Sequence, residues 1–180
     1  PPPPAAMAAR DAARPSLPAA ALEEARRTAA LKASSKMLRA VPAQVLSLAG
    51  LRACDLSNNA IGALPAGIAA LAQLEVLDVG WNRLSRLPDA IGDLRKLREL
   101  HAGFNQLAEL PSSIGRLSQL AVLRLHDNQL GSLPGAVGEL GSLRELQLQY
   151  NAISALPRQM GACGGLRALS LAGNPLRDPP

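Results

Sequence analysis

Apolar and polar residues follow one another in a frame that repeats every 23 residues along most of this chain. Residues 74–96, LEVLDVGWNRLSRLPDAIGDLRK, show the frame, with leucine at positions 1, 4, 11, 14 and 21, asparagine at position 9, proline at position 15 and isoleucine at position 18. Five complete copies and one interrupted copy begin at Leu51, Leu74, Leu97, Leu120, Leu143 and Leu166. A fixed period of this length predicts a repeat architecture.

The alternation over positions 3 to 7 predicts a short strand, with positions 4 and 6 facing the interior and positions 3, 5 and 7 facing the other way. One copy cannot bury its own leucines, but stacked copies can, so the strands should form a parallel sheet in a solenoid. Proline at position 15 ends any strand. The apolar residues at positions 18 and 21 then predict a short helical turn on the outer, convex side.

The asparagine at position 9 lies where the strand must turn away. Its side-chain amide carries two donors and an acceptor, so it can satisfy turn backbone in its own layer and in adjacent layers. We therefore expect a structural ladder of asparagines along one edge. Its members are Asn59, Asn82, Asn105, Asn128, Asn151 and Asn174.

The frame resembles the leucine-rich repeat, in its 23-residue class with Leu-Pro at positions 14 and 15. The resemblance covers residue 51 to the end and implies an α/β, right-handed horseshoe with a concave parallel sheet. Residues 28–50 are a degenerate copy in which Lys36 stands at the asparagine position. A basic helix, a partial copy and then LSNN at residues 56–59 form an opening similar to that of plant intracellular Ras-group-related proteins and of animal leucine-rich-repeat-containing proteins. The resemblance to the plant group implies a signalling scaffold.

The segment before the regular repeats divides into two parts. Residues 1–18 are rich in proline and alanine and predict a disordered arm, with a cleaved transit peptide as the alternative. Residues 19–33 predict a helix with a Glu23–Arg27 pair. We expect this helix to cover the open edge of the first repeat, although a membrane-binding or partner-binding helix is an alternative. The predicted organisation is an arm (1–18), a helix with the degenerate repeat (19–50), and the repeats (51–180).

Charge and cysteine content indicate which partners and which cell compartment suit this chain. The net charge is +5, of which residues 1–50 carry +4, from seven basic and three acidic residues. The nearly neutral repeats argue against a nucleic-acid partner. The sequence contains no run of 18 apolar residues, so it predicts no membrane span.

Cys54 and Cys163 occupy leucine positions and should be buried free thiols. Because no cysteine-rich cap is visible, we predict a cytoplasmic protein, with a cilium or organelle as the alternative.

One leucine position departs from the frame in the third copy, where Ala102 stands at position 6. A smaller side chain there predicts a local gap or an inward shift of the layer, with Phe104 leaning into the space. At the other end of the chain, no segment covers the last layer. We therefore expect either further chain or a partner at that end.

The variable positions on the strand face are the candidates for function. All three aromatic residues of the chain fall at position 8, and both histidines fall at positions 5 and 7. This predicts a patch that binds a protein partner. An equally good interpretation is that bulky residues at position 8 simply follow the loop edge. The candidate partner-binding residues are Trp81, Phe104, Tyr150, His101, Arg124, His126, Asp127, Asp78 and Glu99.

The sequence contains no nucleophile–base motif, phosphate loop or cofactor fingerprint, and two histidines without a third ligand are weak support for a metal site. We therefore predict no catalysis, no cofactor, no metal and no small-molecule substrate. The predicted function is a protein–protein interaction scaffold in Ras-type signalling. Two alternatives remain: a structural subunit of a large ciliary or organellar assembly, and a regulatory part of a larger enzyme.

Overall fold

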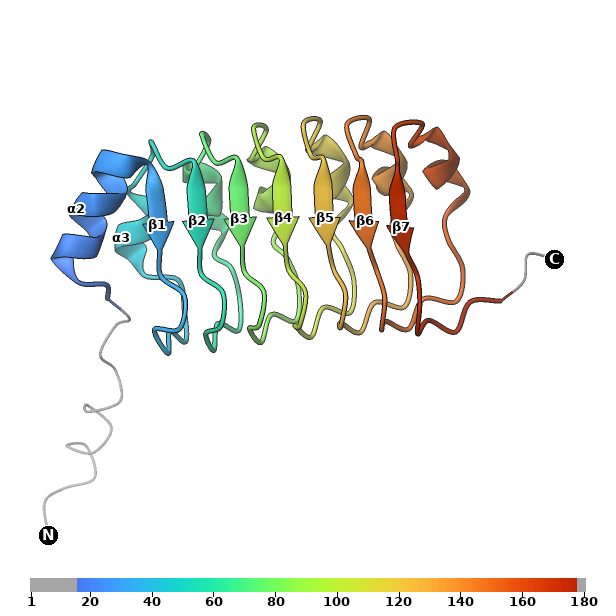
Figure 1. Cartoon of the computed structure of the whole chain (residues 1–180), viewed down its shortest axis with the longest axis horizontal. Coiled ribbons are helices and arrows are strands. Elements are labelled where there is room, and N and C mark those ends of the chain that lie inside the picture. The colour runs from blue at the N-terminus through green and yellow to red at the C-terminus, as the bar shows by residue number, and fades with distance from the viewer. Residues whose placement is uncertain (1–15, 178–180) are drawn as a thin grey trace, which may run out of the picture.

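The computed structural model describes residues 16–177, so most of the predicted arm and the last three residues lie outside the described part. Seven strands lie side by side in one parallel sheet, in the order in which they occur along the chain (Figure 1). The register between neighbours follows the 23-residue period, with Leu77 opposite Leu100 and Leu100 opposite Leu123. The strands are β1 (Ala30–Lys32), β2 (Ala53–Asp55), β3 (Val76–Asp78), β4 (Glu99–His101), β5 (Val122–Arg124), β6 (Glu145–Gln147) and β7 (Ala168–Ser170).

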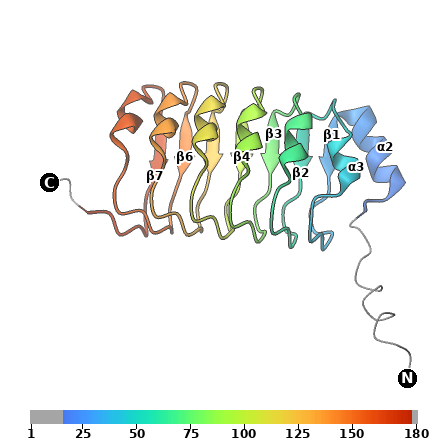
Figure 2. The same cartoon turned by 180° about the vertical axis from the view of Figure 1, so that it is seen from behind.

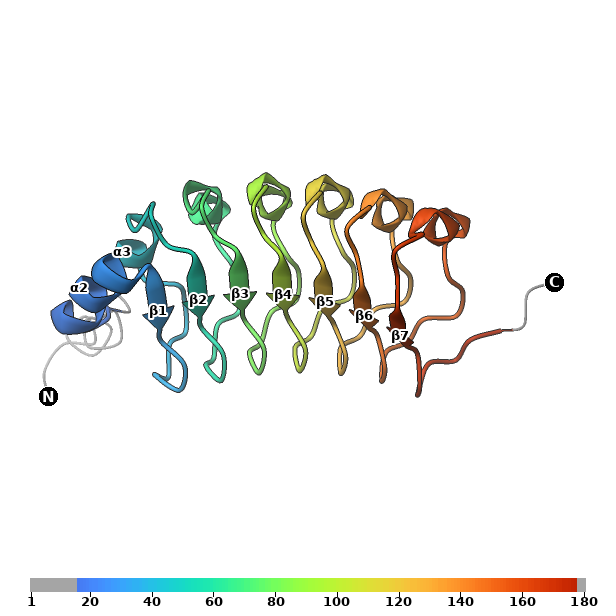
Figure 3. The same cartoon turned by 45° about the horizontal axis from the view of Figure 1, so that its top comes forward.

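A row of short helical turns forms the second layer, behind the sheet (Figures 2 and 3). Each turn begins directly after a proline, which fixes the backbone φ near the helical value but has no amide hydrogen to donate. The turns are α3 (Ala43–Leu46), η1 (Ala66–Ala70), η2 (Asp89–Asp93), η3 (Ser112–Arg116), η4 (Gly135–Glu139) and η5 (Arg158–Ala162), all but α3 being 3₁₀ helices. The predicted helical turn on the outer side is thereby confirmed.

The core lies between these two layers and is almost entirely aliphatic. Residues at position 4 alternate with exposed or half-buried neighbours at positions 3 and 5, as in β4, where Leu100 is fully buried between Glu99 and His101. Leucine or isoleucine at the other apolar positions completes one continuous core along the stack. This arrangement confirms the predicted fold class, an α/β solenoid of stacked repeats.

The predicted helix over residues 19–33 is wrong at its C-terminal end. The helix α2 spans Ala19–Thr28, Ala29 then adopts a left-handed conformation with φ of 55°, and the chain enters β1. Leu31 in β1 is 2 % exposed and lies opposite Cys54, so the degenerate first repeat requires this segment as a strand. The predicted Glu23–Arg27 pair also differs, because Glu23 contacts Arg26 instead.

The helix α2 packs beside β1 at the N-terminal end of the sheet (Figure 1). Ala25 is 1 % exposed, and Leu17 and Leu22 also pack against the core. The helix thus shields the apolar residues of the first layer from water, as a terminal repeat requires. Within residues 16–177, the helices are too short or too polar to cross a lipid bilayer.

The asparagines at position 9 connect neighbouring layers through hydrogen bonds. In Asn105, Oδ1 accepts from the backbone N–H of Leu84 (2.9 Å), while Nδ2 donates to the carbonyl oxygens of Val79 (3.0 Å) and Ala102 (3.2 Å). The same pattern recurs at each asparagine from Asn59 onward. Each side chain therefore completes the backbone hydrogen bonding of the preceding layer as well as its own.

The substitution of alanine for leucine at position 6 of the third copy does not interrupt the sheet. Ala102 is fully buried, and its backbone N–H donates to the carbonyl of Arg124 at 2.8 Å, as its counterparts do in neighbouring layers. Phe104 does not fill the space beside it. Its ring stacks on Trp81 instead, so the expectation that Phe104 leans towards Ala102 is wrong.

Position 19 of the repeat carries alanine or glycine in all five complete copies. A Cβ added to Gly92 would lie closer than 3.0 Å to the backbone oxygen and Cβ of Ser113 in the next turn. Gly138 is equally close to Gln159, whereas a Cβ on Gly161 would meet nothing within 4 Å. The helical turns of successive layers therefore pack backbone to backbone through these glycines.

We expect Gly92→Ala to lower the free energy of unfolding by about 2 kcal/mol, because two turns must move apart to admit one methyl group. Gly161→Ala at the same repeat position should instead be neutral or raise stability by about 0.5 kcal/mol, since alanine restricts the unfolded chain. Urea denaturation of both variants measures the difference. Equal effects of the two substitutions would show that the turns are not in close contact.

Candidate functional site

Position 8 of the repeat holds the backbone in the left-handed region at the point where each strand ends. This conformation is tolerated by glycine, asparagine and aspartate and is uncommon for other residues. Of the six copies from Leu51 onward, three have such a residue and three carry an aromatic ring at φ of 54–56°, while the degenerate copy has Ser35 there at φ of 56°. The residues are Asn58, Trp81, Phe104, Asp127, Tyr150 and Gly173. Strained residues of this kind concentrate at functional sites.

The aromatic rings lie on the surface and contact one another. Trp81 and Phe104 stack with ring centroids 3.7 Å apart and an angle of 18° between the planes. Phe104 and His126 form a T-shaped pair, with ring centroids 5.0 Å apart and an angle of 84° between the planes. Trp81 is 58 % exposed, and Tyr150, three layers further along, is 61 % exposed. Two large apolar side chains thus remain available to a partner.

Because Gly103 has no side chain, the ring of His126 can lie beside Phe104. A Cβ on Gly103 would lie 2.6 Å from the Cε1 and Nε2 atoms of His126, so the histidine ring lies directly over the glycine. Because Gly80 and Gly103 directly precede Trp81 and Phe104, the sequence alone predicts that these glycines leave the aromatic rings less crowded. In the structure, Gly103 makes room for a histidine of the next layer instead.

Charged groups from the ends of β3 and β4 surround His101. Asp78 Oδ1 accepts from the backbone N–H of Gly80 at 2.9 Å, and its Oδ2 lies 3.7 Å from His101 Nδ1. His101 Nε2 is 3.2 Å from Glu99 Oε2. That contact lacks hydrogen-bond geometry, which leaves Nε2 buried without a hydrogen bond among the described residues. The histidine therefore lies between two carboxylates.

Burial alone would raise the pKa of Asp78, but the adjacent His101 ring, the hydrogen bond from the Gly80 N–H and the positive charge of Arg124 outweigh that effect. The pKa of Asp78 therefore lies below its ordinary value, so this carboxylate is charged at neutral pH. In the next layers, Arg124 Nε donates to Glu145 Oε1 at 3.0 Å. His126 Nδ1 lies 3.1 Å from Asp127 Oδ2. The polar side chains of the sheet face are thus held by one another.

The structure gathers most of the predicted partner-binding residues around one shallow hollow of about 170 Å³, here called the aromatic hollow. Its lining residues are Asp78, Gly80, Trp81, His101, Gly103, Phe104, Arg124 and His126. Glu99 and Asp127 adjoin it through the contacts to His101 and His126. Tyr150 follows β6 in the same repeat, two layers beyond Phe104, and does not line the hollow.

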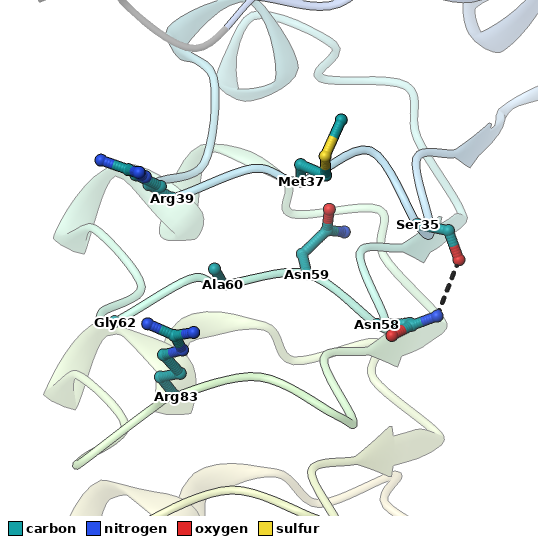
Figure 4. Close-up of a pocket in the computed structure, with 8 residues that line it drawn as sticks. All are labelled: Ser35, Met37, Arg39, Asn58, Asn59, Ala60, Gly62 and Arg83. Atoms are coloured by element: carbon teal, nitrogen blue, oxygen red, sulfur yellow. Dashed lines mark hydrogen bonds between the residues drawn. The ribbon is translucent and has the colours of Figure 1, made fainter. Parts of the chain in front are cut away.

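A larger hollow lies away from these residues, at the edge where the loops leave β1 and β2. It measures about 850 Å³ and is here called the edge notch. Its lining residues are Ser35, Met37, Arg39, Asn58, Asn59, Ala60, Gly62 and Arg83 (Figure 4). Of these, only Asn59 had been singled out from the sequence. The sequence signal that points to this hollow is one layer with small residues at positions 10 and 12, Ala60 and Gly62. The layers on either side carry Arg39 and Arg83.

The two cysteines are unsuited to catalysis. Both are buried and free. Burial, assisted by the negative charge of Asp55, raises the pKa of the Cys54 thiol to about 12. Burial also raises the pKa of Cys163, whose Sγ lies 3.3 Å from the carbonyl oxygen of Val137. Both thiols therefore stay protonated at neutral pH and act as small apolar side chains.

The fold and the site together define a class of protein, a tandem-repeat solenoid whose variable surface residues are carried on a regular aliphatic core. A sequence model of the leucine-rich repeat matches residues 42–107 and 116–176. This chain belongs to the leucine-rich repeat family. Members of the family generally mediate protein–protein interactions and are typically not catalytic.

Solved structures of the same fold include bacterial and plant proteins. A leucine-rich-repeat protein of Leptospira interrogans is 28 % identical, with a TM-score of 0.78 over 88 % of this chain and 47 % of its own. The plant peptide hormone receptor RGFR1, in complex with RGF2, is 32 % identical, with a TM-score of 0.70 over 75 % of this chain and 23 % of its own. No curated protein gives a significant sequence match.

A third similar structure is the ectodomain of the membrane receptor kinase GASSHO1/SCHENGEN3 from Arabidopsis thaliana, in complex with CASPARIAN STRIP INTEGRITY FACTOR 2. It is 31 % identical, with a TM-score of 0.61 over 78 % of this chain and 21 % of its own. This chain therefore spans less than half the length of each of the three. The comparisons establish the family, while the finer resemblance to plant intracellular Ras-group-related proteins stays a prediction.

Proposed function

We propose that this chain is a non-catalytic protein-binding module whose partner contacts Trp81, Tyr150 and the aromatic hollow. The observation that carries the proposal is the placement of three aromatic rings at a left-handed backbone position, on the exposed edge of the sheet. Asparagine, aspartate or glycine would be less strained there, and the chain uses each of them in other layers. Exposed tryptophan and tyrosine are also the residues that most often dominate binding energy at interfaces.

The polar surroundings support a specific interface. His101 and Arg124 are half-buried and lie beside carboxylates, His101 beside Glu99 of its own strand and Asp78 of the neighbouring strand, and Arg124 beside Glu145 of the neighbouring strand. Side chains that are already fixed lose less conformational freedom when a partner binds. The two plant receptor structures of the same family are complexes with RGF2 and CASPARIAN STRIP INTEGRITY FACTOR 2, which agrees with recognition of a protein or peptide.

The proposed setting is inside the cell, in a signalling assembly of the Ras-associated type. The support for it is the sequence resemblance of the N-terminal repeats, together with two buried cysteines that are free. Free thiols are typical of a reducing compartment.

The experiment that tests the proposal compares partners captured by the full chain and by a Trp81→Asn/Tyr150→Asn double variant, using affinity purification and quantitative mass spectrometry. Asparagine removes both rings while suiting the left-handed backbone, as Asn58 does in its own layer. Lys96→Ala, at an exposed position after η2, serves as the control. We expect at least one partner to be retained by the control and depleted tenfold or more by the double variant. Identical partner abundances in all three samples would reject this surface as the binding site.

A separate measurement tests whether the aromatic residues are strained. Tyr150→Asn and Tyr150→Ala both remove the ring, but only asparagine tolerates φ of 56° with little cost. We expect Tyr150→Asn to be more stable than Tyr150→Ala by about 1 kcal/mol in urea denaturation. Tyr150→Phe should match the wild type, because it keeps both the ring and the strain. An alanine variant as stable as the asparagine variant would contradict the strain argument.

A further inference from the structure

The edge notch is formed by the difference in side-chain size between three consecutive layers. In the middle layer, positions 10 and 12 are Ala60 and Gly62, and a Cβ on Gly62 would meet nothing within 4 Å. Longer side chains stand on either side, with Met37 and Arg39 in the preceding layer and Arg83 in the following one (Figure 4). The notch is therefore a gap about one layer wide, since neighbouring strands are about 4.8 Å apart.

The walls of the notch are rigid. Asn59 Oδ1 accepts from the backbone N–H groups of both Lys36 and Leu38 at 3.0 Å, which fixes the loop on either side of Met37. Asn58 Nδ2 donates to Ser35 Oγ at 2.9 Å and connects the same loop to the next layer (Figure 4). A partner would thus meet a preformed surface, which reduces the entropy lost on binding.

Neither arginine of the notch forms an ion pair within residues 16–177. On the sheet side, Arg52 and Arg98 lie near Glu75, and Arg124 pairs with Glu145. Arg39 and Arg83 are exposed, and no carboxylate of the described part lies within ion-pair distance of either. Two arginines lining one hollow, neither paired with a carboxylate of the described part, suit carboxylate groups.

Met37 adds an apolar element to this basic site. Its side chain is 88 % exposed, and its backbone is left-handed with φ of 56°. An exposed methionine on a strained backbone is doubly unfavourable in the isolated chain. Methionine is common at binding surfaces because its flexible, polarizable side chain adapts to different apolar groups.

We propose that the edge notch is a second partner-binding site, which takes an extended acidic peptide segment of another protein. Carboxylates of the segment contact Arg39 and Arg83, its backbone passes over Ala60 and Gly62, and an apolar side chain beside the carboxylates packs on Met37. This site faces the loop edge and is separate from the aromatic hollow, with which it shares no lining residue. The two surfaces can therefore be disabled independently.

Gly62 and Gly131 provide a matched pair of variants for the test. Both occupy position 12, a Cβ on either meets nothing within 4 Å, and neither has a positive φ. Gly62→Leu fills the notch, whereas Gly131→Leu adds the same bulk three layers away, where no arginine flanks the site. Circular dichroism and thermal melting of both variants should match the wild type, which separates blocked binding from unfolding.

The probe is a display library of random eight-residue peptides, depleted first on Gly62→Leu and then selected on the wild-type chain. We expect the surviving peptides to be enriched in aspartate and glutamate next to an apolar residue. Their affinity should fall about tenfold for Arg39→Gln and again for Arg83→Gln, the effect of losing one charge-assisted hydrogen bond each. Gly131→Leu should bind as the wild type does. Survivors without acidic enrichment, undiminished binding to the Arg39→Gln/Arg83→Gln double variant, or no survivors would each overturn the proposal.

Discussion

Asn105→Ala is expected to lower the free energy of unfolding by about 3 kcal/mol. The substitution removes an acceptor for the buried N–H of Leu84 and a donor to the carbonyl oxygens of Val79 and Ala102. These carbonyls keep second partners in Asn82 and Asn128. The N–H group of Leu84 is left unpaired, and a buried unsatisfied group costs about 1–3 kcal/mol in addition to the bonds lost.

The position of an asparagine along the stack should determine the size of this effect. Asn174 makes comparable hydrogen bonds to Ile153 and Leu148 but is only half-buried, so water can replace its amide. Asn174→Ala should therefore cost about 1 kcal/mol. Urea denaturation with matched m-values measures both variants. Asn105→Ala as stable as the wild type would contradict the structural role of the ladder.

Leu100→Ala should destabilise the chain even more, by about 3–4 kcal/mol. Leu100 is fully buried in β4, opposite Leu77 in one neighbour and Leu123 in the other. Truncation removes the transfer free energy of the side chain and leaves a cavity that two rigid neighbouring layers cannot close. Because each layer is stabilised mainly by its neighbours, damage in a central layer weakens two interfaces at once.

Leu169 offers the matched control for that prediction, since it occupies the same repeat position in β7. Its side chain is 40 % exposed and has a neighbouring strand of the described chain on one side only. Leu169→Ala should therefore cost about 1 kcal/mol, in line with partial burial. Thermal and urea denaturation of the two variants test the difference. Equal losses would mean that burial in the stack does not set the contribution of these leucines.

The regular part of this fold was predictable because each structural role is tied to one repeat position. Leu77 had to be buried once the copies stacked, and Pro88 had to precede a turn. The end of α2 was harder to predict, because residues 29–33 are good helix formers and Lys36 replaces the asparagine that marks other layers. Pairing of Leu31 with Cys54 overrides that local helical preference.

The candidate sites were only partly predictable. The concentration of aromatic residues at position 8 was visible in the sequence. Asn58, Asp127 and Gly173 at the same position also indicate a left-handed backbone, but the aromatic residues in the other layers made this signal hard to recognise. The edge notch depends on side chains from three layers. In the sequence, Arg39 and Arg83 lie two layers apart at different repeat positions, and only the structure shows that they line one hollow and that neither meets a carboxylate within residues 16–177.

The direction of the asparagine hydrogen bonds has a consequence for how the chain assembles on the ribosome. Each side chain accepts from an N–H 21 residues earlier and donates to a carbonyl 26 residues earlier, as Asn82 does with Ile61 and Leu56. A newly made layer therefore stays incomplete until the asparagine of the following layer leaves the exit tunnel. Growth should proceed from the N-terminus, one unit behind translation, and a stalled nascent chain should expose one unfinished layer to chaperones.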